Sequence, residues 1–329
     1  MCHEDERLVV NVIVKSEDVA AAVGVSRATV SQILNGRGQR FSESTREKVL
    51  NTAQEMGYRP SIAARTLATG NSDIVVALIP ESNISSQLQQ VLESISTHLL
   101  AEGITLLLRL TTENTAPLVQ MVQQLRPRAI LALLPLTSDE YSVLSENRVP
   151  IVGHQSEDNK FDLIIGRTQA EYLVSRGFTQ LAYIHPGDAR LAKIAKAREH
   201  GLRAVCAESG LSRPLVFELP LNARSATDLV ATLRSHVGIA CFSDDIAIAI
   251  LEAAKAQGRQ VPGDIGIIGM DDSPLAAVVQ PRLTTLSIDV ELATTGLVAP
   301  LWKTLGLVNS NGAEPSGLRA PQVVVGGTT

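Results

Sequence analysis

Cysteines, aromatic residues and long apolar runs are all scarce in this sequence of 329 residues. Its three cysteines, Cys2, Cys206 and Cys241, lack a C-x-x-C spacing, which argues against a disulfide framework and a zinc site. No apolar run approaches the roughly 18 to 20 residues of a membrane-spanning helix, and the opening residues MCHEDER do not resemble a secretory signal. We therefore expect a soluble, cytoplasmic protein that uses no metal, cofactor or membrane.

The motifs of common enzyme sites are also missing. The sequence contains no G-x-S-x-G, P-loop or G-x-G-x-x-G, and His154, His185 and His200 lack the spacing of metal ligands. The acidic pairs Asp244-Asp245 and Asp271-Asp272 could suggest glycosidase chemistry. Adjacent side chains point in different directions, however, and both pairs lie at the carboxyl ends of expected strands, where acidic residues cap helices. We therefore do not expect an enzyme.

Charge is distributed unevenly along the chain. Residues 8–70 carry eight Lys or Arg and five acidic residues, whereas the whole chain has a net charge of −5, so the remainder carries −8. Neutralisation of phosphates supplies much of the affinity of proteins for nucleic acids. A small basic segment attached to a large acidic body therefore suggests a module that binds nucleic acid.

The first seventy residues contain three short helical patterns separated by turn signals. We expect Ser16 to cap the first helix, Ser26 the second and Ser42 the third. In the second, VGVSRATVSQILNGRG (23–38), the apolar residues Val30, Ile33 and Leu34 form one face, and most other positions are small, hydroxylic or amide-bearing. Such a pattern, with two helices joined by a short turn and braced by a third, is typical of a helix-turn-helix.

From residue 73 onward, apolar strand patterns alternate with helical patterns. This alternation predicts parallel sheets covered by helices on both faces, and about 250 residues favour two lobes with a cleft between them. The expected strands are 74–80, 104–110, 129–135, 149–154, 181–186, 215–220, 239–243 and 265–272. The expected helices are 88–103, 116–127, 170–176, 191–209, one that ends near 233 and one that ends near 257.

Three stretches resemble the LacI family of bacterial transcription regulators. They are DVAAAVGVSRATVSQILNG (18–36), FSESTREKVLNTAQEMGYRPSIAARTLATG (41–70) and QGRQVPGDIGIIGMDDSPLAAVVQPRLTTL (257–286). The resemblance implies a small all-α helix-turn-helix domain followed by a two-lobed, periplasmic-binding-protein-like α/β domain with parallel sheets. The implied boundaries are 1–60 for the DNA-binding domain, 61–71 for a hinge helix or linker, and 72–329 for effector binding and dimerisation.

The resemblance also implies which residues bind double-stranded operator DNA. Arg27, Ala28 and Gln32 would read base edges, because Arg pairs with guanine, Gln with adenine and Ala with the thymine methyl group. Thr29, Ser31 and Asn35 would lie nearer the phosphates, and Ser16 and Ser26 belong to the same surface. In the hinge, Leu67 would enter between central base pairs, Ala64 would allow close approach, and Ser61 stands where the family usually has Asn.

Effector residues are implied at the carboxyl ends of the strands, where open α/β sheets bind ligands. Arg198, Ser243 and Asp271 match family positions that hold ligand hydroxyls or an anion. Further polar residues at strand ends are Ser82, Asn83 and Gln155. Family aromatics are replaced by Ser85, Ser86 and Met270. The effector is thus expected to be a small molecule that is sugar-like, polar or anionic.

Taken together, these features predict a DNA-binding transcriptional regulator, a repressor that binds a pseudo-palindromic operator as a homodimer under effector control. The sequence leaves a tetramer open. It also leaves open a regulator whose body binds a protein corepressor in place of a small molecule.

Overall fold

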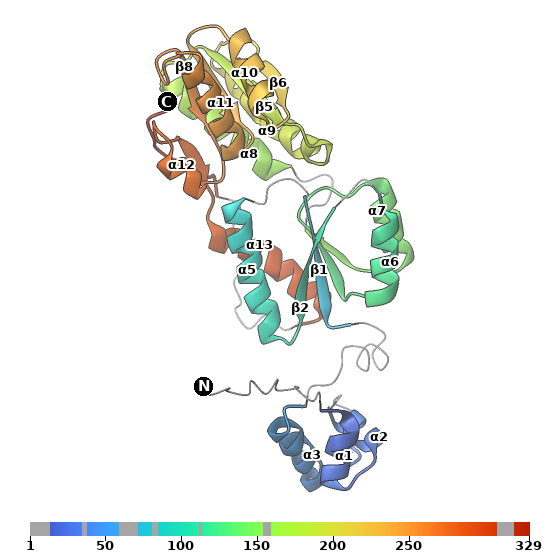
Figure 1. The fold of residues 1–329 in the computed structure, drawn as a ribbon. Helices are drawn as coiled ribbons and strands as arrows, with labels where there is room; N and C mark the ends of the chain where they lie inside the picture. Colours follow the sequence, from blue (N-terminus) through green and yellow to red (C-terminus); the bar gives the residue numbers. More distant parts are fainter. Residues whose placement is uncertain are drawn as a thin grey trace, which may run out of the picture. The chain divides into compact units, whose positions relative to one another are not determined.

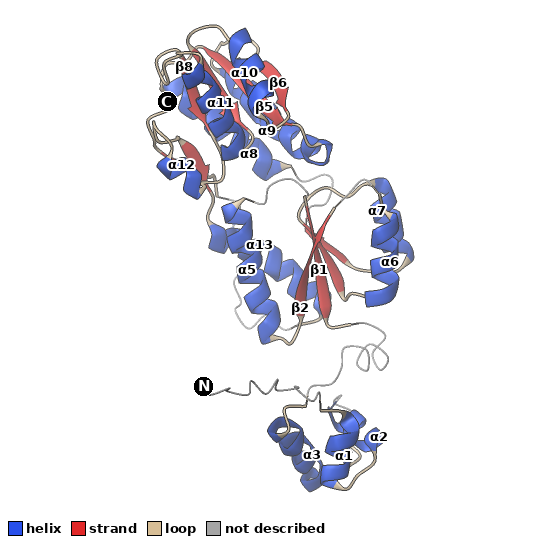
Figure 2. Cartoon of the chain, viewed as in Figure 1, coloured by secondary structure: helices blue, strands red, loops and turns tan. Residues whose placement is uncertain are grey.

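The structure is a computed structural model that describes residues 14–34, 38–58, 72–80, 85–111, 114–153, 159–307 and 319–329. The chain divides into two compact units, Met1–Asp73 and Ile74–Thr329. The described part of the first unit, here called the head, is helical, whereas the second unit, the body, contains parallel sheets between layers of helices (Figure 1, Figure 2). Among the described residues, no helix combines the length and apolar character needed to cross a bilayer.

Three short helices form the described part of the head, namely α1 (Ser16–Val23), α2 (Arg27–Leu34) and α3 (Glu43–Glu55). The predicted caps of α2 and α3 are confirmed, because Ser26 Oγ accepts from the Thr29 amide at 3.1 Å and Ser42 Oγ accepts from the Thr45 amide at 3.3 Å. The small core of the head consists of Val19, Ala20, Val30, Ile33, Val49 and Ala53.

The predicted capping role of Ser16 is wrong. Lys15 occupies the N-cap, and Ser16 is the first residue of α1. The Asp18 carboxylate accepts a hydrogen bond from the Lys15 amide at 2.7 Å, so an acidic residue three positions on satisfies the free amide of the cap residue. Helix α1 ends at Val23, and its C-cap residue Gly24 has a φ of 76°, in the left-handed region that favours glycine.

Lobe 1 of the body is built on a parallel sheet with the strand order β2-β1-β3-β4. Alternate residues of β1 face opposite layers, with Val75 and Ala77 in one cluster and Val76 and Leu78 in another. The strands are β1 (Ile74–Ile79), β2 (Thr105–Leu110), β3 (Ala129–Ala132) and β4 (Ile151–Gly153). The helices are α5 (Ser86–Ala101), α6 (Ala116–Leu125) and α7 (Ser138–Glu146).

Lobe 2 repeats this topology with the order β6-β5-β7-β8. Ala182 and Ile184 of β5 face the layer of α10 and α11, and Leu181 and Tyr183 face the layer of α8 and α9. The strands are β5 (Gln180–Pro186), β6 (Leu215–Leu219), β7 (Val237–Cys241) and β8 (Ile265–Ile268). The helices are α8 (Lys160–Ser175), η1 (Ala189–Leu191), α9 (Ala192–Glu208), α10 (Ala223–Thr232), α11 (Asp244–Ala256) and α12 (Pro274–Val278).

The chain returns to lobe 1 after lobe 2. Helix α13 (Val290–Leu305) packs beside α5, and its Leu301 and Trp302 join the cluster of Val75 and Ala77 (Figure 1). The chain then re-enters lobe 2, where β10 (Gln322–Val324) pairs antiparallel with β9 (Thr285–Ser287). The predicted fold class of a small helical domain followed by a two-lobed α/β domain is therefore confirmed.

One predicted helix is much longer than expected. The helix expected at 170–176 begins at Lys160, and the glycine in its middle, Gly166, accounts for the error because glycine weakens helical patterns. In the structure, Gly166 is required by a close approach of α8 to α9. A Cβ atom there would meet the Arg198 carbonyl oxygen, and a Cβ at Gly201 would meet the Leu163 carbonyl oxygen.

Replacing Gly166 by Ala tests this approach. The added methyl group forces α8 and α9 apart, and we expect the free energy of unfolding to fall by about 1 to 3 kcal/mol. The control is Gly296→Ala in α13, where an added Cβ meets nothing within 4 Å. That variant should be more stable than wild type by about 0.5 to 1 kcal/mol. Urea unfolding followed by circular dichroism measures both, and equal stabilities would refute the packing constraint.

Candidate functional site

Helix α2 presents one polar face outward from the head. Arg27, Ala28 and Ser31 are exposed, whereas Val30 and Ile33 are buried in the core of the head. Thr29, Gln32 and Leu34 are half-buried. The predicted division of this helix into one apolar and one polar face is thus confirmed, with Leu34 less buried than its two apolar neighbours.

The start of α2 is held by polar contacts. Ser26 Oγ lies 2.9 Å from Thr29 Oγ1, so the two hydroxyl groups share a hydrogen bond. Arg27 Nη1 donates to Glu17 Oε1 of α1 at 3.3 Å. Four predicted DNA-binding residues, Asn35, Ser61, Ala64 and Leu67, lie outside the described residues.

In lobe 2, Arg198 lies at the centre of a partly buried polar group. Its Nε donates to Asp162 Oδ1 at 3.0 Å, and its Nη1 donates to the Phe242 carbonyl oxygen at 2.9 Å. The guanidinium carbon also lies 4.4 Å from the centroid of the Phe242 ring. The Arg198 and Asp162 side chains are 12% and 11% exposed. We call Arg198, Asp162, Phe242 and Asp271 the strand-end site, because Phe242 and Asp271 follow β7 and β8.

Asp271 is the acidic member that joins this site to lobe 1. The hydroxyl group of Ser85, the N-cap residue of α5, favours the charged form of the Asp271 carboxylate and so opposes the rise in its pKa that burial causes. Its backbone φ of 111° is unusual for a residue other than glycine, and such strain is often found at functional sites. Burial raises the pKa of Asp271 to about 7, although the positive charge of Arg198 opposes this shift.

The adjacent residues Ser243 and Asp244 have mainly local roles. Ser243 is the N-cap of α11, and its hydroxyl group accepts from the Ile246 amide at 3.5 Å. Asp244 is buried, and its carboxylate accepts from Thr285 Oγ1 at 2.5 Å and from the Ser273 amide at 2.7 Å. Burial raises its pKa to about 6. Asp244 thereby ties the loop after β8 to the start of α11.

Two groups of site residues escaped the sequence prediction. Asp162, the partner of Arg198, lies on the part of α8 that the sequence did not predict to be helical. His185, at the end of β5, lies with Nε2 2.7 Å from Glu199 Oε2, and Arg203 Nε lies 2.5 Å from Glu199 Oε1. The only signal in the sequence for the group of His185, Glu199 and Arg203 was a spacing. Glu199 and Arg203 lie four residues apart on a predicted helix, where opposite charges can pair.

Polar contacts between side chains join the two lobes. Arg190 of η1 donates to both carboxylate oxygens of Glu140 in α7, at 3.1 and 3.0 Å, and these side chains are 13% and 4% exposed. Gln87 of α5 donates to Ser287 Oγ at 2.8 Å. The relative position of the lobes around the strand-end site is therefore fixed by specific polar groups.

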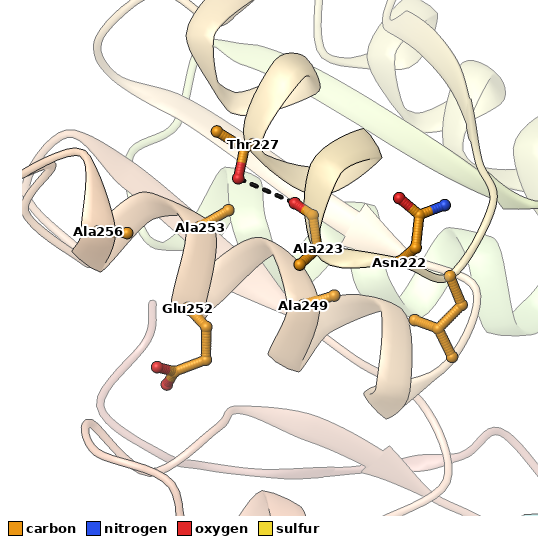
Figure 3. A pocket seen from close by; sticks show the side chains of 8 residues that line it. Asn222, Ala223, Thr227, Ala249, Glu252, Ala253 and Ala256 are labelled. Carbon is orange, nitrogen blue, oxygen red and sulfur yellow. Dashed lines mark hydrogen bonds between the residues drawn. The ribbon is translucent and has the colours of Figure 1, made fainter.

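The remaining predicted effector residues, Ser82, Asn83 and Gln155, lie outside the described residues. A hollow of about 370 Å³ between α10 and α11 is lined largely by apolar side chains, including Leu221, Ala249 and Ala253 (Figure 3). The described residues of the strand-end site do not line this hollow. Within the described ranges, no group of His, Cys and acidic side chains has the arrangement of a metal site.

Two family models match stretches of the chain. Residues 17–61 match the model of bacterial regulatory proteins of the lacI family, and residues 170–329 match a periplasmic binding protein-like domain. The transcriptional repressor PurR of Vibrio campbellii is 26% identical over 82% of this chain and 85% of its own length. The regulators DegA of Bacillus subtilis and MalR of Streptomyces coelicolor are each 28% identical, over 82% and 95% of this chain and 85% and 95% of their own lengths.

Solved structures have a similar fold over most of the chain. A lac repressor dimer bound to operator and the anti-inducer ONPF superposes with a TM-score of 0.74 at 21% identity, covering 96% of this chain and 98% of that one. A complex of the transcriptional regulator CelR with cellobiose gives a TM-score of 0.64 at 22% identity, covering 96% and 100%. The predicted periplasmic-binding-protein-like architecture is confirmed.

The raised pKa of Asp271 predicts a pH-dependent stability. Between its ordinary pKa of 3.8 and about 7, the folded protein retains a proton that the unfolded chain releases. The free energy of unfolding should therefore decrease as the pH rises across this interval. Asp271→Asn removes the contribution of Asp271, although Asp244, whose pKa burial raises to about 6, keeps its own contribution of the same sign. The variant should be more stable than wild type by about 1 to 3 kcal/mol at pH 8, with a smaller gain at pH 5.

The matched control is Asp272→Asn, because Asp272 also has a positive φ, of 43°, but is exposed. Chemical denaturation at both pH values should give this variant the pH dependence of wild type. A gain for Asp271→Asn that is the same at pH 5 and pH 8 would contradict the assignment.

Proposed function

We propose that this chain is a member of the lacI family of bacterial regulatory proteins and a transcriptional repressor that binds a pseudo-palindromic operator as a homodimer under the control of a small molecule. The observation that carries this proposal is the geometry of α2, which anchors Val30 and Ile33 in the core of the head and presents Arg27, Ala28 and Ser31 to solvent. That is what a helix needs to lie in the major groove.

The polar face of α2 has side chains suited to base edges. Arg27 would pair with guanine and Gln32 with adenine, while Ala28 would contact a thymine methyl group. Ser16, Ser26, Thr29, Ser31 and Asn35 would contact phosphates or position the helix. In a two-fold dimer, two such helices address two half-sites.

The proposed roles are assigned to the domains whose boundaries the sequence predicts. Residues 1–60 bind DNA in the cytoplasm, where a regulator meets its operator, 61–71 form the hinge, and 72–329 bind the effector and the second subunit. In the hinge, Leu67 would act as an apolar wedge at the operator centre, helped by Ala64 and Ser61. A wedge of this kind unstacks a base step and bends the duplex.

Charges in the strand-end site favour a neutral effector over an anionic one. The positive charge of Arg198 is already paired with Asp162, and Asp271 and the buried Asp244 lie nearby. An anion entering this site would meet no uncompensated cation among the described residues of the strand-end site. A neutral ligand rich in hydroxyl groups would instead exchange hydrogen bonds with Arg198, Asp271 and Ser243, helped by Ser82, Asn83 and Gln155.

The contacts between the lobes supply a route from effector to DNA. Ser85 of lobe 1 stabilises the charged form of Asp271, so a ligand that engages Asp271 acts at the border between the lobes. The Arg190–Glu140 pair stabilises the same arrangement of the lobes. A ligand that prefers one arrangement shifts the population toward it, and the linked hinges then change spacing.

Selection of bound sequences from random duplex DNA tests the proposed function. We expect an enriched two-fold symmetric site with a flexible central step. Arg27→Ala should relax the preference at one base pair of each half-site, at a cost of about 1 to 3 kcal/mol in discrimination. The control Lys48→Ala, an exposed residue of α3, should leave the preferred sequence unchanged. Binding without any enriched motif, with and without a pool of candidate effectors, would contradict the proposal.

A further inference from the structure

The contact between Glu17 and Arg27 places an acidic side chain on the surface proposed to face DNA. Glu17 lies in the first turn of α1, and Arg27 is the first residue of α2. Glu17 Oε1 accepts a hydrogen bond from Arg27 Nη1 at 3.3 Å, and the two side chains are 65% and 68% exposed. An exposed ion pair of this kind contributes little to folding stability, so stability does not explain its position.

The geometry of the guanidinium group makes the contact informative. Glu17 engages Nη1, which leaves Nε and Nη2 on the opposite edge as two parallel donors. Guanine presents O6 and N7 as two acceptors in the major groove, and a bidentate pair with Arg requires such an edge. The Glu17 carboxylate therefore restrains the orientation of Arg27 before DNA arrives and leaves the base-reading edge free.

Because the described residues of the head carry no excess positive charge, the Glu17 carboxylate lowers the affinity of the head for non-specific DNA. The described residues 14–34 and 38–58 contain five basic residues and five acidic residues. Because non-specific binding depends on phosphate neutralisation, a negative charge beside a leading cation of α2 weakens contacts to any DNA backbone. The cost is offset where Arg27 finds a guanine, since its charge is then shared between the base and Glu17.

We propose that Glu17 is a positioning residue that makes Arg27 selective for a base edge over a phosphate. The proposal rests on the proposed function, in which α2 enters the major groove. The chemistry that it recognises is a guanine at one position of each half-site. A purely structural role for Glu17, as an acidic residue near the N-terminus of α1, would affect helix stability alone.

The test compares Glu17→Gln with Glu47→Gln in the full-length protein. Glu47 is exposed on α3, so its substitution removes the same charge from the head at another place. Dissociation constants are measured on the selected operator, on operators changed at the base pair that Arg27→Ala relaxes, and on a non-specific duplex, each at two salt concentrations. Circular dichroism verifies that each variant is folded.

Glu17→Gln should reduce discrimination at the Arg27 base pair by at least about fivefold and should strengthen non-specific binding at low salt. Glu47→Gln should retain wild-type discrimination. In the Arg27→Ala background, Glu17→Gln should have no further effect on discrimination, because the residue that it positions is gone.

Two results would overturn the inference and leave the proposed function intact. One is wild-type discrimination in Glu17→Gln, and the other is an equal loss of discrimination in Glu47→Gln. Absence of any sequence preference in the wild-type protein would overturn the proposed function and the inference together, so the two failures are distinguishable.

Discussion

The strand-end site of lobe 2 depends on the ion pair between Arg198 and Asp162. It joins α9 to α8 across a contact that Gly166 and Gly201 make close enough, since a Cβ at either position would meet backbone of the other helix. The same guanidinium donates to the Phe242 carbonyl oxygen at the end of β7. Two helices and a strand end are thereby fixed relative to one another, and the strand-end site inherits its geometry from them.

The consequence is a site that is rigid within lobe 2 and responsive at its border with lobe 1. Arg198 and Asp244 are held by several partners inside lobe 2, whereas Ser85 of lobe 1 influences the charge of Asp271 and Arg190 pairs with Glu140 of lobe 1. A ligand can exchange partners at this border without dismantling the core. Such an arrangement suits a protein whose proposed task is to convert ligand binding into a change between lobes.

Local patterns in the sequence were sufficient for much of the fold. Apolar strand runs and the caps Ser26 and Ser42 depend on neighbours in the chain, and they were predicted correctly. The start of α8 was missed because Gly166 serves a contact with α9 that no local pattern reveals. Asp162 was missed with it, and Ser16 was misassigned because Asp18 reaches back to the amide of Lys15. The family resemblance identified Arg198, whereas only the structure shows that its positive charge is paired with Asp162.

The measurement that most directly tests the account is the operator dissociation constant in the presence of matched pairs of compounds, each a neutral hydroxylated molecule and its phosphorylated form. The account predicts that a neutral compound changes this constant by about tenfold or more, equivalent to about 1.4 kcal/mol of coupling, and that operator DNA changes the affinity for that compound by the same factor. Its phosphorylated form should have no such effect. A dissociation constant that responds only to the phosphorylated compounds, or to none of the pairs, would contradict the account.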